Sequence, residues 1–318
     1  MVEKKDFSLS ANFNVSFNKN KVDKLASGET EWKQKAALSN WSGTYDYKLV
    51  VGQTMGLIYG YQTDGFYTVD DFEFTAPGTW TLKPGIADNS SFSSGGFPFK
   101  PGGIKFKKLS PVDESLPEVD QYRITEEDLT VIGNTNPKMI GGFGLSATWK
   151  GFDFTSFFNF MYGFDVFNVN KFKISSVQSH NYNNFLSNFD MAHRFRYLDD
   201  QGVNLVRNPE ALAALNENAS IYSPQSLTQG ITMDYLIEDG SFLRLSTLTL
   251  GYTIPGKYMN KIGVRSLRVY ASGYNLYTWT KYTGYDPEVN VQNGLTPGLD
   301  NNVYPRSRTL TFGINLNF

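Results

Sequence analysis

The chain has 318 residues, enough for one large all-β domain or two smaller domains. Its 29 basic residues nearly balance its 31 acidic residues, and the formal charge of −2 gives no reason to expect nucleic acid as a partner. Aromatic residues make up 15%, no run of about 18 apolar residues could cross a membrane as a helix, and the lack of cysteine excludes disulfides and thiolate metal sites.

The N-terminal segment, MVEKKDFSLS, has no apolar stretch of the kind found in a secretory signal peptide, so we expect any export signal to lie elsewhere. In residues 7–17, FSLSANFNVSF, apolar and polar side chains alternate without interruption. This alternation predicts a strand with one apolar face, long enough to cross the hydrocarbon core of a membrane.

Four more strands are predicted before the middle of the chain, at 45–51, 55–67, 139–149 and 152–162. Only Lys150 and Gly151 separate the last two, which indicates a tight antiparallel hairpin. Between 55–67 and 139–149 lies a long loop, 68–138, that is rich in turn-forming residues.

A second long loop, 163–241, contains one predicted helix. Asn208 can cap this helix, Pro209 suits its first position, and Glu210 lies where the helix dipole favours negative charge. Two histidines, His180 and His193, also lie in this loop, but no ligand-like spacing accompanies them, so we expect solvated side chains instead of a metal pair.

Three strands are predicted in the last part of the chain, at 242–254, 265–279 and 308–318. In the first, Leu243 and Leu245 share one parity while the later apolar residues share the other, which predicts either a bulge near Ser246 or a strand boundary that differs from 242–254. The last strand, RTLTFGINLNF, places Phe312 and Phe318 on its apolar face.

Long and short connections alternate along the chain, so every long loop should lie at one end of an antiparallel sheet and every tight turn at the other. Outer-membrane barrels have this asymmetry, whereas a globular sandwich rarely contains loops of about 70 to 80 residues. We therefore predict an all-β fold: an antiparallel up-and-down transmembrane β-barrel portion of about eight strands with long extracellular loops.

No catalytic site is predicted. Gly141, Gly142 and Gly144 lack the lysine and helix of a phosphate loop, so they are interpreted as glycines at a strand end. The acidic pair at 70–71 and the acidic run at 126–128 lack the partner groups that glycosidase chemistry needs. We expect neither an enzyme nor a cofactor.

The aromatic residues fall into two predicted classes. Those near strand ends on the apolar parity would lie at the membrane interface: Trp149, Tyr162, Tyr252 and Trp279. Those in the long loops would either pack within the loops or stack on a ligand: Trp80, Phe92, Tyr182 and Tyr222.

Four long motifs resemble the C-terminal part of SusC/RagA-family TonB-dependent transporters. They are VGQTMGLIYGYQTDGFY, VIGNTNPKMIGGFGLSATWKGFDFTSFFNFMYGFDVFN, DGSFLRLSTLTLGYTIP with LRVYASGYNLYTWTKYTGYDPEVN, and YPRSRTLTFGINLNF. The resemblance implies an outer-membrane barrel that pairs with a SusD-like surface lipoprotein and imports glycan or peptide fragments with energy delivered by TonB. Because large barrels of this kind have 22 strands and a plugged lumen, residues 1–318 would form only the C-terminal segment, without plug or signal peptide.

The resemblance also bears on two smaller features. The family often has a calcium-loop-like motif before the IGN sequence, but the aligned positions hold Pro117, Val119, Gln121 and Tyr122, leaving only Asp128, so no metal is expected. A terminal aromatic resembles a signal read by the barrel-assembly machinery, which would give that role to Phe312 and Phe318. Two alternatives stay open: a secreted β-rich glycan-binding module, and a small self-closed outer-membrane barrel.

Overall fold

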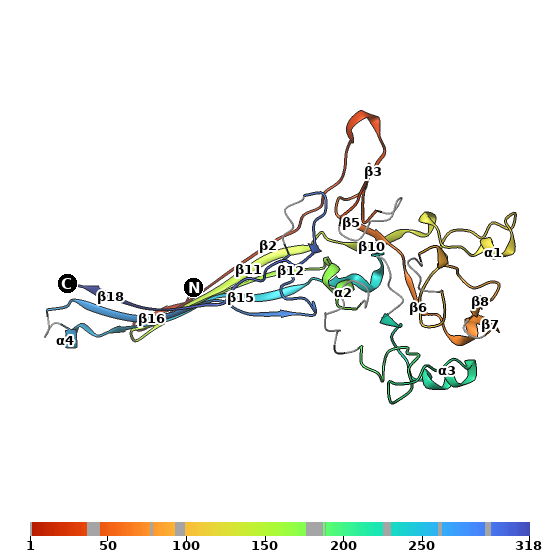
Figure 1. The fold of residues 1–318 in the computed structure, drawn as a ribbon. Helices are drawn as coiled ribbons and strands as arrows, with labels where there is room; N and C mark the ends of the chain where they lie inside the picture. The colour runs from red at the N-terminus through yellow and green to blue at the C-terminus, as the bar shows by residue number, and fades with distance from the viewer. Residues whose placement is uncertain are drawn as a thin grey trace.

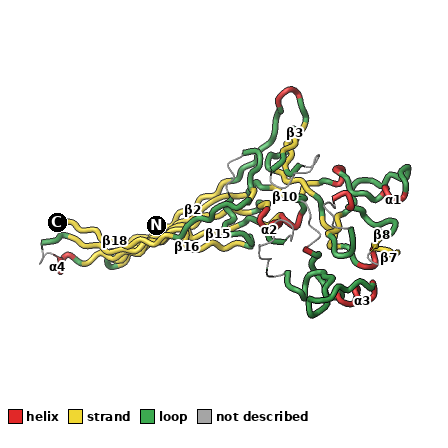
Figure 2. Tube along the Cα trace, in the orientation of Figure 1, coloured by secondary structure: helices red, strands yellow, loops and turns green. Residues whose placement is uncertain are grey.

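The computed structural model describes residues 2–36, 45–76, 79–92, 99–175, 187, 189–224, 230–259, 263–289 and 294–318. A long, twisted sheet projects from a head built of loops and short elements (Figures 1 and 2). The sheet has seven antiparallel strands in the order β1 (Val2–Lys4), β2 (Phe7–Ser16), β11 (Met139–Trp149), β12 (Phe152–Tyr162), β15 (Phe242–Ile254), β16 (Ser266–Thr280) and β18 (Thr309–Asn317).

The described part of the head contains four smaller sheets. They are β10 (Thr130–Asn134), β5 (Leu57–Gly60), β4 (Tyr47–Val50) and β3 (Glu31–Gln34); β14 (Ile237–Asp239), β13 (Asp165–Asn168) and β17 (Leu299–Asp300); β6 (Thr63–Phe66) with β9 (Ile104–Phe106); and β7 (Phe72–Ala76) with β8 (Thr79–Leu82). The helices are α1 (Glu118–Gln121), α2 (Val169–Lys173), α3 (Pro209–Leu215) and α4 (Gly256–Met259), with 3₁₀ turns at Ala26–Gly28, Val69–Asp71, Ser90–Phe92, Glu126–Asp128 and Asp234–Leu236. None of the helices described has the length and apolar character needed to cross a membrane.

Strand register divides the sheet into an apolar and a polar face, because residues opposite each other on neighbouring antiparallel strands point to the same side. Phe13 on β2 lies opposite Phe143 on β11, and Phe143 lies opposite Phe158 on β12. The intervening positions are mostly polar, and Ser10 lies opposite Ser146. The predicted up-and-down antiparallel sheet is confirmed.

The predicted bulge at Ser246 is also confirmed. Leu245 and Thr247 on β15 lie opposite the consecutive residues Phe158 and Phe157 on β12, so Ser246 is the unpaired extra residue of this ladder. On the other side they lie opposite Tyr277 and Tyr274, so β16 is also irregular here. Because one extra residue reverses the parity, Leu245 and Leu248 share the apolar face although the sequence places them on opposite parities.

Two of the eight strands predicted for the transmembrane sheet, which we call the wall, do not belong to it, so their assignment is wrong. Segments 45–51 and 55–67 contain β4 and β5, which belong to the head, where Tyr47 and Ile58 are almost fully buried. Each of these strands has only four residues, too few to cross a hydrocarbon core. The described wall therefore consists of six long strands and the short β1, and β1 and β18 lie at opposite edges, so the structure does not show a small self-closed barrel.

The connections segregate to the two ends of the sheet as predicted. The hairpin at Lys150 and Gly151 has positive φ at both residues, 46° and 89°, as a type I′ turn requires. At the opposite end, the described residues of 17–138, 163–241 and 281–308 together build the head (Figure 1). Its core cluster joins side chains from all three segments, including Ile58, Phe167 and Leu299.

Helix α3 begins as predicted, with the side chain of Asn208 accepting a hydrogen bond from the Ala211 N–H.

Candidate functional site

The apolar face of the sheet is exposed over its whole length. Phe13, Phe312 and Phe318 have 67%, 80% and 78% of their surface exposed. A soluble protein would cover such a continuous apolar surface with a second layer, and nothing among the described residues covers it. The face is suited to contact hydrocarbon.

Aromatic residues bound this face at both ends. Trp149 and Phe152 pair beside the short turn, and the Phe152 ring lies 4.5 Å from the Tyr252 ring. Tyr162 and Trp279 lie at the head end and are about half exposed. Phe152 and Tyr162 are ten positions apart on β12, about 33 Å along the strand, which becomes about 25 Å at the usual barrel tilt. That height matches the apolar band of an outer-membrane barrel, so the structure brings the four predicted girdle residues to the expected places.

The opposite face carries a network of polar side chains. The hydroxyls of Ser8 and Thr148 lie 2.6 Å apart, and those of Thr249 and Ser272 lie 2.9 Å apart. The Arg268 guanidinium donates two hydrogen bonds to the Asp153 carboxylate, at 2.9 and 2.5 Å. Such a surface favours water or a polar solute over lipid, as in a barrel lumen.

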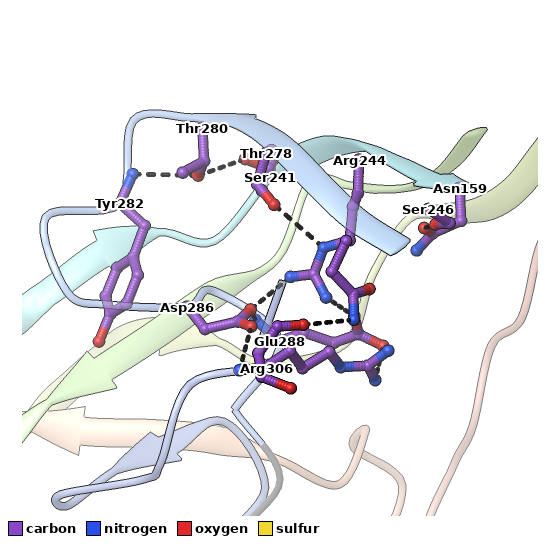
Figure 3. Close-up of polar contacts among 12 residues, drawn as sticks. Asn159, Ser241, Arg244, Ser246, Thr278, Thr280, Tyr282, Asp286, Glu288 and Arg306 are labelled. Atoms are coloured by element: carbon purple, nitrogen blue, oxygen red, sulfur yellow. Dashed lines mark hydrogen bonds and ion pairs between the residues drawn. The ribbon is translucent and has the colours of Figure 1, made fainter. Parts of the chain in front are cut away.

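At the head end of the polar face, Arg244 is buried in a charge cluster (Figure 3). Its Nε donates to the Thr278 hydroxyl at 3.0 Å, and one terminal nitrogen donates to Asp286 at 2.5 Å. The other terminal nitrogen forms an ion pair with Glu288 at 3.0 Å, without a hydrogen bond between the two atoms. Arg306 reaches Glu288 from outside at 2.7 Å. The cluster ties the 281–308 segment to β15 and β16.

Asp128 is the one acidic residue left in the calcium-like alignment, and its carboxylate is fully buried. It accepts hydrogen bonds at 2.8 Å from the N–H groups of Leu109, Ser110 and Thr125, and Lys108 lies 3.3 Å away. Burial by itself raises the pKa of Asp128, but these hydrogen bonds outweigh it and hold the pKa below its usual value. The Asp128 carboxylate therefore holds the loop at Leu109 and Ser110 against the turn that begins at Thr125.

Replacing Asp128 with alanine should loosen this part of the head, because the buried N–H groups lose a charged acceptor, which costs about 1.5 to 3 kcal/mol for each such bond. Amide hydrogen exchange at Leu109, Ser110 and Thr125 should accelerate. Because the folded-state pKa is lowered, the same protection should be present above about pH 4 and be lost as the pH falls below it. Asp113→Ala, at an exposed turn, is the control. Unchanged exchange at all three amides would contradict this role.

The predicted loop aromatics have different surroundings. The Phe92 ring packs 5.1 Å from Tyr61, and Tyr222 is buried against Phe189 and Tyr235. Tyr182 and His180 lie outside the described residues. Trp80 lines an open cleft and remains a proposed ligand contact, and the role of Tyr182 stays a prediction. His193 is exposed, with its Nδ1 2.7 Å from Asp190.

The cleft next to Trp80 has a volume of about 830 Å³. Its walls also include Lys100, Ser223, Pro224 and several residues between Met191 and Arg207, such as Arg194, Tyr197 and Leu205. Neither this cleft nor the Arg244 cluster was predicted from the sequence, because their members are far apart in the chain. The only sequence signal was the high density of arginines at 194, 196 and 207.

The sequence comparisons identify relatives of one class, although no family model matches the chain. The chain is 30% identical over 323 aligned residues to TonB-dependent receptor P3 of Formosa agariphila, a match that covers all of this chain and 27% of that protein. It is 40% identical over 87 residues to TonB-dependent receptor SusC of Bacteroides thetaiotaomicron, covering 27% of this chain and 8% of SusC.

The comparison with solved structures finds the same kind of fold in a transporter. A solved structure of the RagAB peptide transporter superposes with a TM-score of 0.64 at 20% identity, covering 100% of this chain and 28% of that chain. At this identity the likeness shows the fold. The chain thus spans little more than a quarter of the relatives and structures that match its whole length.

Proposed function

We propose, on the premise that this chain is homologous to a segment of the SusC/RagA-family TonB-dependent receptors, that it forms part of the barrel wall of an outer-membrane nutrient importer. The observation that carries this proposal is the two-faced sheet. Its exposed apolar face is bounded by aromatic residues about 25 Å apart, and its other face is polar. Lipid would contact the first face, and the second would line the lumen.

The proposed cargo and partners rest on the same homology. The imported solute would be a glycan or peptide fragment, captured with a SusD-like surface lipoprotein that sits over the head. This chain would be the C-terminal segment of the receptor. Energy would come from TonB acting on other parts of the receptor, outside these 318 residues. No enzymatic step is included, since the relatives are receptors and transporters by name.

Fractionation of cells that produce the full-length receptor tests the membrane assignment. The protein should sediment with the outer membrane, resist alkaline extraction, and require detergent for release. A secreted β-rich glycan-binding module would instead be released without detergent, and that result would end the proposal.

The head should face the cell exterior, because outer-membrane barrels have short periplasmic turns and long external loops. An epitope tag inserted between Glu217 and Asn218, two exposed residues after α3, should be reached by antibody on intact cells. A tag within the 255–264 turn should be reached only after the outer membrane is opened. The reverse pattern would mean that the sheet is inserted upside down.

A further inference from the structure

The cleft beside Trp80 has an unusual distribution of charge. Lys100, Arg194, Arg196 and Arg207 all line it. Within the described parts of the chain, Lys100, Arg194 and Arg207 form no ion pair with a carboxylate. Only Arg196 is engaged, by Asp200 and by the carbonyl oxygens of Leu198 and Asp199. Three cationic side chains are therefore available for an anion.

Lys100 is partly buried, and its Nζ lies 4.2 Å from the centre of the Tyr197 ring. Burial lowers the pKa of Lys100, because removal from water disfavours the charged form. The Tyr197 hydroxyl donates to the Pro101 carbonyl at 2.7 Å, which holds the ring in place under the ammonium group. An anion bound here would stabilise the charged Lys100 ammonium group and so offset the hydration that this group loses on burial.

The remaining lining is apolar. Val203 and Leu205 are 71% and 58% exposed, and Met191 and Leu198 continue the same surface. No acidic or carboxamide side chain is among the described residues that line the cleft. A neutral sugar needs hydrogen-bond acceptors for its hydroxyls, and carboxylates and amides are the usual side chains that supply them. The lining instead matches a ligand with an anionic group beside apolar groups.

We propose that this cleft binds an acidic peptide segment in which aspartate or glutamate alternates with apolar side chains. The carboxylates would contact Arg194, Arg207 and Lys100, while the apolar side chains would pack on Trp80, Val203 and Leu205. This inference rests on the proposed import function, because it assigns the cleft to capture of the cargo.

The test uses the full-length receptor in detergent and three probes of equal length: an acidic peptide of alternating Glu and Leu, the same peptide with Lys for Glu, and an oligogalacturonate. Calorimetric titration should detect the first probe and not the second, with an affinity that falls as salt increases. The double variant Arg194→Gln/Arg207→Gln should weaken binding of the acidic peptide at least tenfold, and Leu205→Ser should weaken it severalfold.

Arg123→Gln is the matched control, because Arg123 is an exposed arginine of the head outside the cleft and pairs with Asp120. It should leave affinity unchanged, and every variant should still reach the outer membrane. Equal binding of oligogalacturonate with the same loss in the double variant would overturn the peptide assignment. No change of affinity in the double variant, as expected if another part of the receptor fills the cleft, would overturn the site. Either result would leave the fractionation and topology tests of the importer unaffected.

Discussion

Replacing Arg244 with methionine is expected to destabilise the head end of the barrel wall by about 3 to 5 kcal/mol, since removing one member of a buried ion pair leaves the other uncompensated. Arg244 is only 2% exposed, while Asp286 and Glu288 remain mostly buried beside it. Thermal unfolding of the full-length receptor in detergent should shift to lower temperature. Limited proteolysis should cut first within 281–308, the segment that this cluster holds.

Two companion variants separate the charge effect from packing. Arg306→Gln removes a half-exposed partner of Glu288 and should cost less than about 1 kcal/mol. Adding Asp286→Asn and Glu288→Gln to Arg244→Met should recover part of the stability, because no uncompensated buried charge then remains and Arg306 is half exposed to water. If Arg244→Met and Arg306→Gln had equal effects, the buried cluster would not be what holds the segment.

Introducing arginine at Leu145 should have the next largest effect. Leu145 lies near the middle of β11 on the apolar face, opposite Ala11 and Ser156. A charged side chain at the bilayer midplane costs about 2 to 4 kcal/mol in outer-membrane barrels. The amount of full-length receptor assembled in the outer membrane should fall, and its urea midpoint in lipid should decrease.

The adjacent residue provides the control. Ser146 lies on the polar face, opposite Ser10 and Thr155, so Ser146→Arg should cost far less because its guanidinium can reach water or polar groups. A similar loss for both variants would mean that the two faces are not separated by lipid and lumen.

The sequence by itself located the six long strands of the large sheet and divided them into an apolar and a polar face. Uninterrupted alternation over about ten residues is a local property of the chain, and it identified β2 and β18, while shorter alternating stretches located β11 and β16. The change of parity in 242–254 located the bulge at Ser246, and Asn208 followed by Pro209 located the start of α3. These features depend on neighbouring residues only, so no tertiary contact was needed to predict them.

Only the tertiary structure decided what covers each apolar surface. Alternation in 45–51 and 55–67 indicates an apolar face but not its environment, and in the folded head β4 and β5 bury theirs against residues as distant as Leu299. Charge pairing is likewise non-local: Arg244 meets Asp286 across 42 positions. The cleft assembles only when Trp80, Lys100 and residues 191–207 are brought together. Such contacts arise from chain closure over long separations, which no local pattern specifies.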